Sequence, residues 1–252
     1  MPCGGDDNVS SCLRRYTRST RPRARLVCFP HAGGSASFYY PWRAFVPPDV
    51  EVTAVQYPGR HDRLSEPCID TMDELVRGLL RELDQVGDVP TIFVGHSMGA
   101  SVAYECLLRM SWSPKLLVAS ARTAPSLGRG GTLHLKDDGE LLAELEKLGG
   151  FEAKEVSDPE LLELVMPALR ADYRLIESYQ PDCAARACIP ILGAVGADDL
   201  RVSVADVRAW EHATTGAFDV TVYPGDHFYI RQHGHTLVQS ALHWISPNDV
   251  PS

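Results

Sequence analysis

The segment TIFVGHSMGASVAYECLL, residues 91–108, predicts a strand that turns sharply into a helix. Its apolar beginning fits a buried strand, and its remainder fits a helix. Between them, Gly95 and Gly99 flank Ser97 in a Gly-x-Ser-x-Gly pattern. Glycines on both sides allow a tight turn that presents the serine at the tip of the strand. The segment therefore predicts that Ser97 is a nucleophile.

Partners for a nucleophilic serine follow in the chain in the order acid, histidine. Asp199 comes after an apolar strand predicted over 189–195, and His227 comes after another predicted over 218–223. Reactive groups of open α/β sheets lie outside the carboxyl ends of the strands. We therefore expect Ser97, Asp199 and His227 to meet at one edge of a sheet.

Two further aspartates compete for the role of the acid. Asp199 is favoured over Asp198 because residues 200–203 fit the start of the next helix, which leaves Asp198 as a turn residue. Asp226 is the neighbour of His227, and adjacent side chains usually point apart. Asp226 is therefore interpreted as a turn-forming residue.

An oxyanion hole requires two backbone N–H groups aimed at the developing charge. The first is expected from Met98, the residue after the nucleophile. The second is expected from the loop after the strand at 26–30, where Ala32 precedes Gly33 and Gly34. These glycines would let the backbone approach a substrate closely. Ala32 and Met98 are the predicted donors.

Alternating strand and helix patterns indicate an α/β protein with a mostly parallel central sheet and helices on both faces. A helix is predicted over 70–86, with Thr71 and Glu74 as a capping box, and a last helix over 234–245. The predicted strands lie near residues 26–30, 51–56, 91–95, 115–120, 189–195 and 218–223.

Nearly seventy residues separate two of these strands, far more than one crossover helix needs. A helical insertion is therefore predicted over about 126–185. Its expected helices are one over 138–148, a second that opens at Ser157, and a third over about 167–179. Helices placed there would form a lid above the edge of the sheet.

Five motifs, taken together and in order, resemble the type II (editing) thioesterases that accompany polyketide synthases and nonribosomal peptide synthetases. The resemblance spans about residues 24–246 and departs from the family at Asp226, where a second glycine is usual. The motifs are Phe29–Ser35, Gln56–Arg60, Gly95–Ala100, Asp172-Tyr173 and His227–Tyr229.

The resemblance implies an α/β-hydrolase fold and a serine thioesterase that removes aberrant acyl groups from the phosphopantetheine arms of acyl or peptidyl carrier proteins. Because His227 would activate water to release the acid from Ser97, we expect no metal and no cofactor; the phosphopantetheine belongs to the substrate. Residues expected to shape the substrate pocket are His31, Gly33, His96 and Phe228. Two alternatives stay open: a serine carboxylesterase or acyl-CoA thioesterase acting on small soluble substrates, and a non-catalytic binding protein on the same fold.

Composition fits one catalytic domain, expected over 24–247 after a flexible leader at 1–23. The 252 residues carry a net charge of −9, which disfavours a nucleic-acid partner. Neither a membrane-length apolar stretch nor a signal peptide is apparent, so we expect a cytoplasmic protein without a membrane partner. Seven cysteines without a Cys-x-x-Cys pair indicate neither a zinc site nor a disulfide framework.

Basic residues near the N-terminus form an arm, Arg14 to Arg25. This arm is interpreted as a solvated leader, and contact with an acidic carrier protein is the alternative. Arg43, Arg60 and the arm are the candidates for carrier docking.

Overall fold

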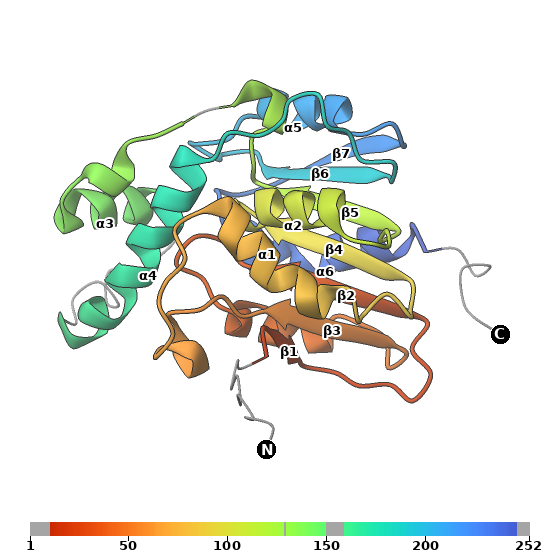
Figure 1. The fold of residues 1–252 in the computed structure, drawn as a ribbon. Helices are drawn as coiled ribbons and strands as arrows, with labels where there is room; N and C mark the ends of the chain where they lie inside the picture. The colour runs from red at the N-terminus through yellow and green to blue at the C-terminus, as the bar shows by residue number, and fades with distance from the viewer. Residues whose placement is uncertain (1–10, 129, 150–158, 246–252) are drawn as a thin grey trace, which may run out of the picture.

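A single twisted sheet organises the computed structural model, which describes residues 11–128, 130–149 and 159–245 (Figure 1). In this part of the chain the strand order is β1-β3-β2-β4-β5-β6-β7; β1 pairs antiparallel with β3, and the other neighbours are parallel. The mostly parallel sheet predicted from the sequence is confirmed. The strands are β1 (Leu13–Arg15), β2 (Ala24–Phe29), β3 (Val50–Val55), β4 (Thr91–His96), β5 (Leu116–Ser120), β6 (Ile191–Gly196) and β7 (Phe218–Tyr223).

Helices cover both faces of the sheet, and alternation along each strand decides which face a side chain joins. In β2, Val27 and Phe29 pack on one face while Leu26 and Cys28 pack on the other. The first face carries α1 (Met72–Leu83), α2 (Met98–Arg109) and α5 (Val204–Arg208), followed by η5 (Ala209–Ala213). The second carries η1 (Ala36–Ala44) and α6 (Ile230–Leu242), and α6 lies behind the sheet in Figure 1.

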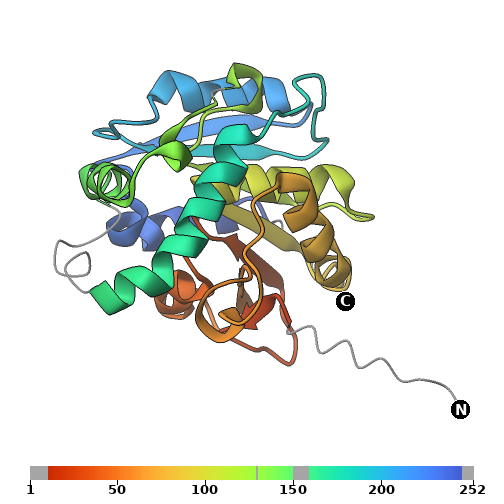
Figure 2. The same ribbon diagram turned by 60° about the vertical axis from the view of Figure 1, so that its left-hand side comes forward.

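The predicted insertion between β5 and β6 is helical. Its two longer helices lie to one side of the sheet, outside the layers formed by α1, α2 and α6 (Figures 1 and 2). They share a small core of their own, made by Leu141, Leu145, Met166, Leu169 and Tyr173. The elements are η3 (Pro125–Leu127), η4 (Leu133–Leu135), α3 (Asp138–Lys147) and α4 (Pro159–Ser178).

One continuous helix, α4, replaces the second and third helices expected in the insertion. Pro167 lies inside it, although a proline removes one backbone donor and usually breaks a helix. Met166 and Leu169 are buried on either side of the proline, so tertiary packing holds the helix together across it. Ser157, where the second helix was expected to open, lies outside the described residues.

Two local expectations about helix ends are wrong. Thr71 is the N-cap residue of α1, but its side chain makes no capping hydrogen bond, so the capping box with Glu74 does not form. The last helix begins at Ile230, four residues earlier than predicted. Where a helix begins also depends on how the preceding loop packs, and the local sequence pattern does not show this packing.

The leader predicted over residues 1–23 is partly built into the fold. Within it, β1 pairs with β3, and the backbone amide of Val52 donates to Thr17 Oγ1 over 2.6 Å. Arg14 pairs with Asp62 at 2.6 Å, and Arg23 pairs with Asp49 at 2.8 Å. Arg25 pairs with Glu51 at 2.8 Å, so half of the arm's six arginines are paired within the chain. Residues 1–10 lie outside the described part.

A short helical segment, η2 (His61–Arg63), completes the loop between β3 and α1. In that segment and elsewhere in the described chain, no helix is both long and apolar enough to cross a bilayer. Nor do the described residues include a group of three or more His, Cys, Asp or Glu side chains arranged to hold a metal ion.

Candidate active site

Ser97 stands on a strained turn between β4 and α2. Its φ of 54° and ψ of −122° are unusual for a residue with a side chain. A Cβ atom on Gly95 would lie 2.4 Å from Ala100 Cα, and one on Gly99 would lie 2.0 Å from the carbonyl oxygen of Phe29. Both glycines are therefore required by close backbone contact, as the Gly-x-Ser-x-Gly pattern indicates.

Three strand ends bring a serine, a histidine and an aspartate into one hydrogen-bonded row. Ser97 Oγ lies 3.0 Å from His227 Nε2, and Asp199 Oδ2 lies 2.8 Å from His227 Nδ1. The other oxygen of Asp199 accepts the backbone amides of Arg201 at 2.8 Å and Val202 at 3.1 Å. With the carboxylate fixed in this way, the imidazole is oriented to accept a proton from the serine.

Neither of the competing aspartates contacts this row. Asp198 is exposed, and its backbone amide donates to the carbonyl of Gly225 at 2.9 Å. The Asp226 carboxylate accepts the backbone amide of Phe228 at 2.8 Å, a contact typical of a turn. The geometry places Asp199, and not its neighbour, beside His227.

The loop after β2 carries the backbone amide of Ala32, one of the two predicted oxyanion donors. Gly33 donates its amide to Asp172 Oδ2 at 2.7 Å, and Gly34 donates to the carbonyl of His31 at 2.9 Å. Within the described chain, the amide of Ala32 has no acceptor. Met98 is the first residue of α2, where helix geometry provides no acceptor for the backbone amide. Ala32 and Met98 thus remain as candidate oxyanion donors.

A cluster of aromatic and imidazole rings packs against the ring of His227. The His96 ring lies 5.4 Å from the His227 ring, and the His31 ring lies 4.9 Å from that of Phe228. His96 has no exposed surface and Phe228 is 6% exposed. Both are predicted to shape the substrate pocket, and in the structure both rings lie beside that of His227, with Phe228 5.3 Å away.

The histidines of this cluster are neutral near pH 7. Burial, with a smaller contribution from the charge of Arg231, lowers the pKa of His31 to about 3. Burial also lowers the pKa of His96 well below its usual value, and its Nδ1 lies 2.9 Å from Ser120 Oγ. Neutral rings beside His227 add no positive charge that would oppose its protonation.

A buried ion pair joins the lid to the oxyanion loop. Arg60 donates to both oxygens of Asp172, at 2.6 and 2.9 Å, and to the carbonyl of Gly34 at 3.1 Å. The same carboxylate accepts the amide of Gly33. Asp172 belongs to α4, so this one carboxylate connects the lid, the Gln56–Arg60 loop and the loop that carries Ala32.

This pair corrects the expectation that Arg60 docks a carrier protein. Its side chain is 7% exposed and fully engaged within the chain, so it offers no free charge at the surface. The motifs that contain Arg60 and Asp172 were noticed in the sequence, but their contact was not predicted. In the sequence, the only indication of this contact is that the two residues have opposite charges, and they lie 112 positions apart.

The parallel sheet, the strained serine turn and the row of serine, histidine and aspartate define the class of the protein, an α/β-hydrolase. A family model described as a thioesterase domain matches residues 24–245. The chain belongs to this thioesterase family and is a hydrolase that acts on thioesters.

Relatives from biosynthetic pathways share most of their length with this chain. It is 40% identical over 244 residues to a probable cadicidin biosynthesis thioesterase of Streptomyces griseus, which covers 94% of this chain and 68% of the relative. It is 38% identical over 239 residues to the thioesterase PikA5 of Streptomyces venezuelae, covering 91% and 84%. Among solved structures, the type II thioesterase BorB from the borrelidin biosynthetic cluster superposes with a TM-score of 0.84 at 38% identity, covering 93% and 97%.

We predict that Asp172→Ala destabilises the protein strongly, because it leaves the Arg60 guanidinium buried without a counter-charge. The expected loss in the free energy of unfolding is about 3–5 kcal/mol, measured by chemical denaturation. Arg174→Ala is the matched control: it removes an exposed ion pair of the same helix, with Asp70, and should cost less than about 1 kcal/mol. Equal losses in the two variants would contradict the proposed anchor.

Proposed function

We propose that this protein releases aberrant acyl groups from the phosphopantetheine arms of acyl or peptidyl carrier proteins, and so keeps a modular synthase productive. The observation that carries the proposal is the row of Ser97, His227 and Asp199, with both oxygens of Asp199 occupied, in a chain of the thioesterase family. The setting proposed for this reaction is the cytoplasm.

In the first half of the proposed reaction, His227 Nε2 removes the proton of Ser97 Oγ as this oxygen attacks the thioester carbonyl carbon. The amides of Ala32 and Met98 stabilise the oxyanion of the tetrahedral intermediate. The intermediate collapses, the carbon–sulfur bond breaks, and the proton held by His227 passes to the departing thiolate. An acyl-serine and a free pantetheine thiol result.

In the second half, water replaces the thiol. His227 removes a proton from water as the water oxygen attacks the acyl-serine carbonyl, and it then returns the proton to Ser97 Oγ. Asp199 stabilises the imidazolium in both halves and keeps the productive tautomer. The products are a carboxylic acid and the regenerated serine, so each step balances with protein groups and water alone, and we propose that no cofactor takes part.

Similarity to proteins of synthase pathways supports a carrier protein as the partner. One relative is named for the biosynthesis of gramicidin S, at 32% identity over 222 residues. Another is the phenyloxazoline synthase MbtB of Mycobacterium tuberculosis, in which the matching segment covers 16% of the longer protein. A thioesterase-like segment thus occurs within a synthase chain as well as in separate proteins.

Ser97→Ala should lower kcat by about 10⁴-fold or more, because the attacking oxygen is lost. Hydrolysis of acyl-pantetheine is measured for the variant, with Ser126→Ala, at an exposed serine of η3, as the control. Mass spectrometry of the wild type with a slow substrate should show one added acyl group, and Ser97→Ala should show none. Turnover of the variant near the wild-type rate would refute a serine mechanism.

Asp199→Asn should lower kcat by about 10³- to 10⁴-fold, because an amide facing Nδ1 favours the wrong imidazole tautomer. Asp198→Asn is the matched control, since it makes the same chemical change one residue away at an exposed side chain. Its kcat should stay within about twofold of the wild type. If the two variants ranked in the opposite order, the assignment of the acid would be wrong.

Carrier recognition is tested with one acyl group on two supports, a carrier protein and a truncated pantetheine thiol. Remote binding energy should raise kcat/KM for the carrier substrate. Arg43 is exposed on η1, with its guanidinium 3.8 Å from the centre of the Tyr40 ring. Arg43→Glu should lower kcat/KM for the carrier substrate only.

Equal kcat/KM values on the two supports would show that the carrier is not recognised. A hydrolase of small soluble thioesters or esters would then explain the activity better.

A further inference from the structure

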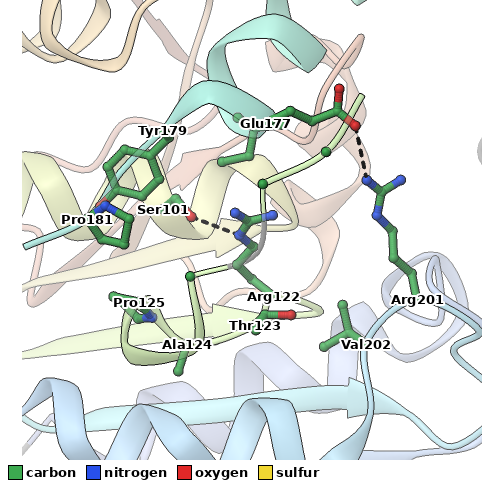
Figure 3. Close-up of a pocket in the computed structure, with 14 residues that line it drawn as sticks. Ser101, Arg122, Thr123, Ala124, Pro125, Glu177, Tyr179, Pro181, Arg201 and Val202 are labelled. Atoms are coloured by element: carbon green, nitrogen blue, oxygen red, sulfur yellow. Dashed lines mark hydrogen bonds and ion pairs between the residues drawn. The ribbon is translucent and has the colours of Figure 1, made fainter. Parts of the chain in front are cut away.

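A cavity of about 200 Å³ lies between the end of β5, the first turns of α2, and the end of α4 (Figure 3). Two guanidinium groups, from Arg122 and Arg201, line it together with the carboxylate of Glu177. Three glycines of the lid, Gly128, Gly130 and Gly131, and the residues that follow Asp199 complete the wall. No step of the proposed hydrolysis uses these side chains.

The cavity adjoins Ser97 through the backbone. Ser101 lines the cavity and follows Ser97 by one turn of α2, a rise of about 6 Å. The carbonyl of Ser120 accepts the amide of Ser97 at 2.8 Å, and Arg122 follows two residues later. Ser97 and the cavity are therefore neighbours along both α2 and the end of β5, although Ser97 itself does not line the cavity.

The cavity also borders the loop that follows Asp199. The two residues whose amides hold Asp199 Oδ1, Arg201 and Val202, also line the cavity. The loop that positions Asp199 thus forms part of the cavity wall.

Positive charge in the cavity exceeds negative charge. Arg122 Nε donates to Ser101 Oγ at 2.9 Å, and its two terminal nitrogens have no acceptor in the described part of the chain. Burial, with the nearby charge of Arg201, lowers the pKa of Arg122 to about 10, so the group is still protonated at pH 7. In the described part of the chain it is a half-buried cation without a counter-charge.

Glu177 does not neutralise Arg122. Its carboxylate accepts the amides of Leu133 and His134 at 3.1 and 2.9 Å, and lies 2.7 Å from His134 Nδ1. The nearest guanidinium nitrogen of Arg201 is 4.0 Å away. The carboxylate thus fastens the lid loop at 131–134 and leaves the charge of Arg122 unmatched.

We propose that this cavity binds a carboxylate at the far end of the acyl group, so that the enzyme selects thioesters of dicarboxylic acids over neutral ones of equal length. A planar guanidinium with two free nitrogens matches a carboxylate in a bidentate pair. The cavity has room for about six water-sized groups, enough for a carboxylate and part of its chain. A wholly apolar chain in the cavity would displace water from the guanidinium of Arg122 without pairing its charge, which is unfavourable.

The proposal, which rests on the proposed thioesterase function, is tested with pantetheine thioesters in matched pairs: succinyl with butyryl, glutaryl with valeryl, and adipyl with hexanoyl. At one or more of these lengths, wild-type kcat/KM should be about tenfold higher for the acid. Arg122→Gln should lower kcat/KM for that acid by about 30-fold or more, and for its neutral partner by less than about threefold.

Controls separate a lost contact from a damaged fold. Arg122→Lys keeps the charge without the planar fork and should fall between the wild type and Arg122→Gln. Arg208→Gln removes an exposed arginine of α5 and should leave both series unchanged. A neutral partner preferred at every length, or an equal loss in both series with Arg122→Gln, would overturn the proposal.

A binding measurement distinguishes this inference from the proposed function. Free glutarate should raise the melting temperature of Ser97→Ala, valerate should not, and Arg122→Gln in that background should abolish the increase. If neither series were turned over but this increase persisted, the thioesterase proposal would fail and the carboxylate site would stand. An increase with inorganic phosphate but not with glutarate would assign the cavity to a phosphate group and overturn the proposal.

Discussion

The ion pair between Arg60 and Asp172 is the contact on which the relation between lid and core depends. A carboxylate taken from water into a buried position needs hydrogen-bond donors at both oxygens, and here the Arg60 guanidinium and the amide of Gly33 supply three. Because Gly33 is held in this way, the neighbouring amide of Ala32 has a defined position. Through this pair, the position of α4 helps to determine the position of the loop that carries Ala32.

Around Ser97, structure separates the groups that can move a proton from those that only support. His227 bridges the serine and the aspartate. The two neighbouring histidines are held neutral by burial, with the pKa of His31 at about 3. Of the three imidazoles at the site, His227 is the one whose position between Ser97 and Asp199 suits it to pass a proton to a thiol and to take one from water.

What could be predicted from the sequence depends on how local the signal was. The turn at Ser97 is encoded by glycines two residues away on either side, so sequence alone placed it. Asp199 and His227 follow strand ends, and a parallel sheet brings such ends to one edge. No local sequence pattern predicts that Arg60 pairs with Asp172 or that a helix continues through Pro167. Nor does a local pattern show that Arg14 is paired with an aspartate rather than free in solvent. These depend on tertiary contacts between segments far apart in the chain.

The close approach of α4 to the oxyanion loop limits how this enzyme could be recombined. A Cβ atom on Gly33 would lie 2.7 Å from Leu169 Cδ1, so the lid helix and the loop have complementary surfaces as well as a shared charge. A lid transplanted from a relative would have to bring matching residues at positions 33 and 60, which lie outside the insertion. The exchangeable unit is accordingly three separate segments of chain, and chimaeras cut only at the ends of the insertion would separate residues that fit one another.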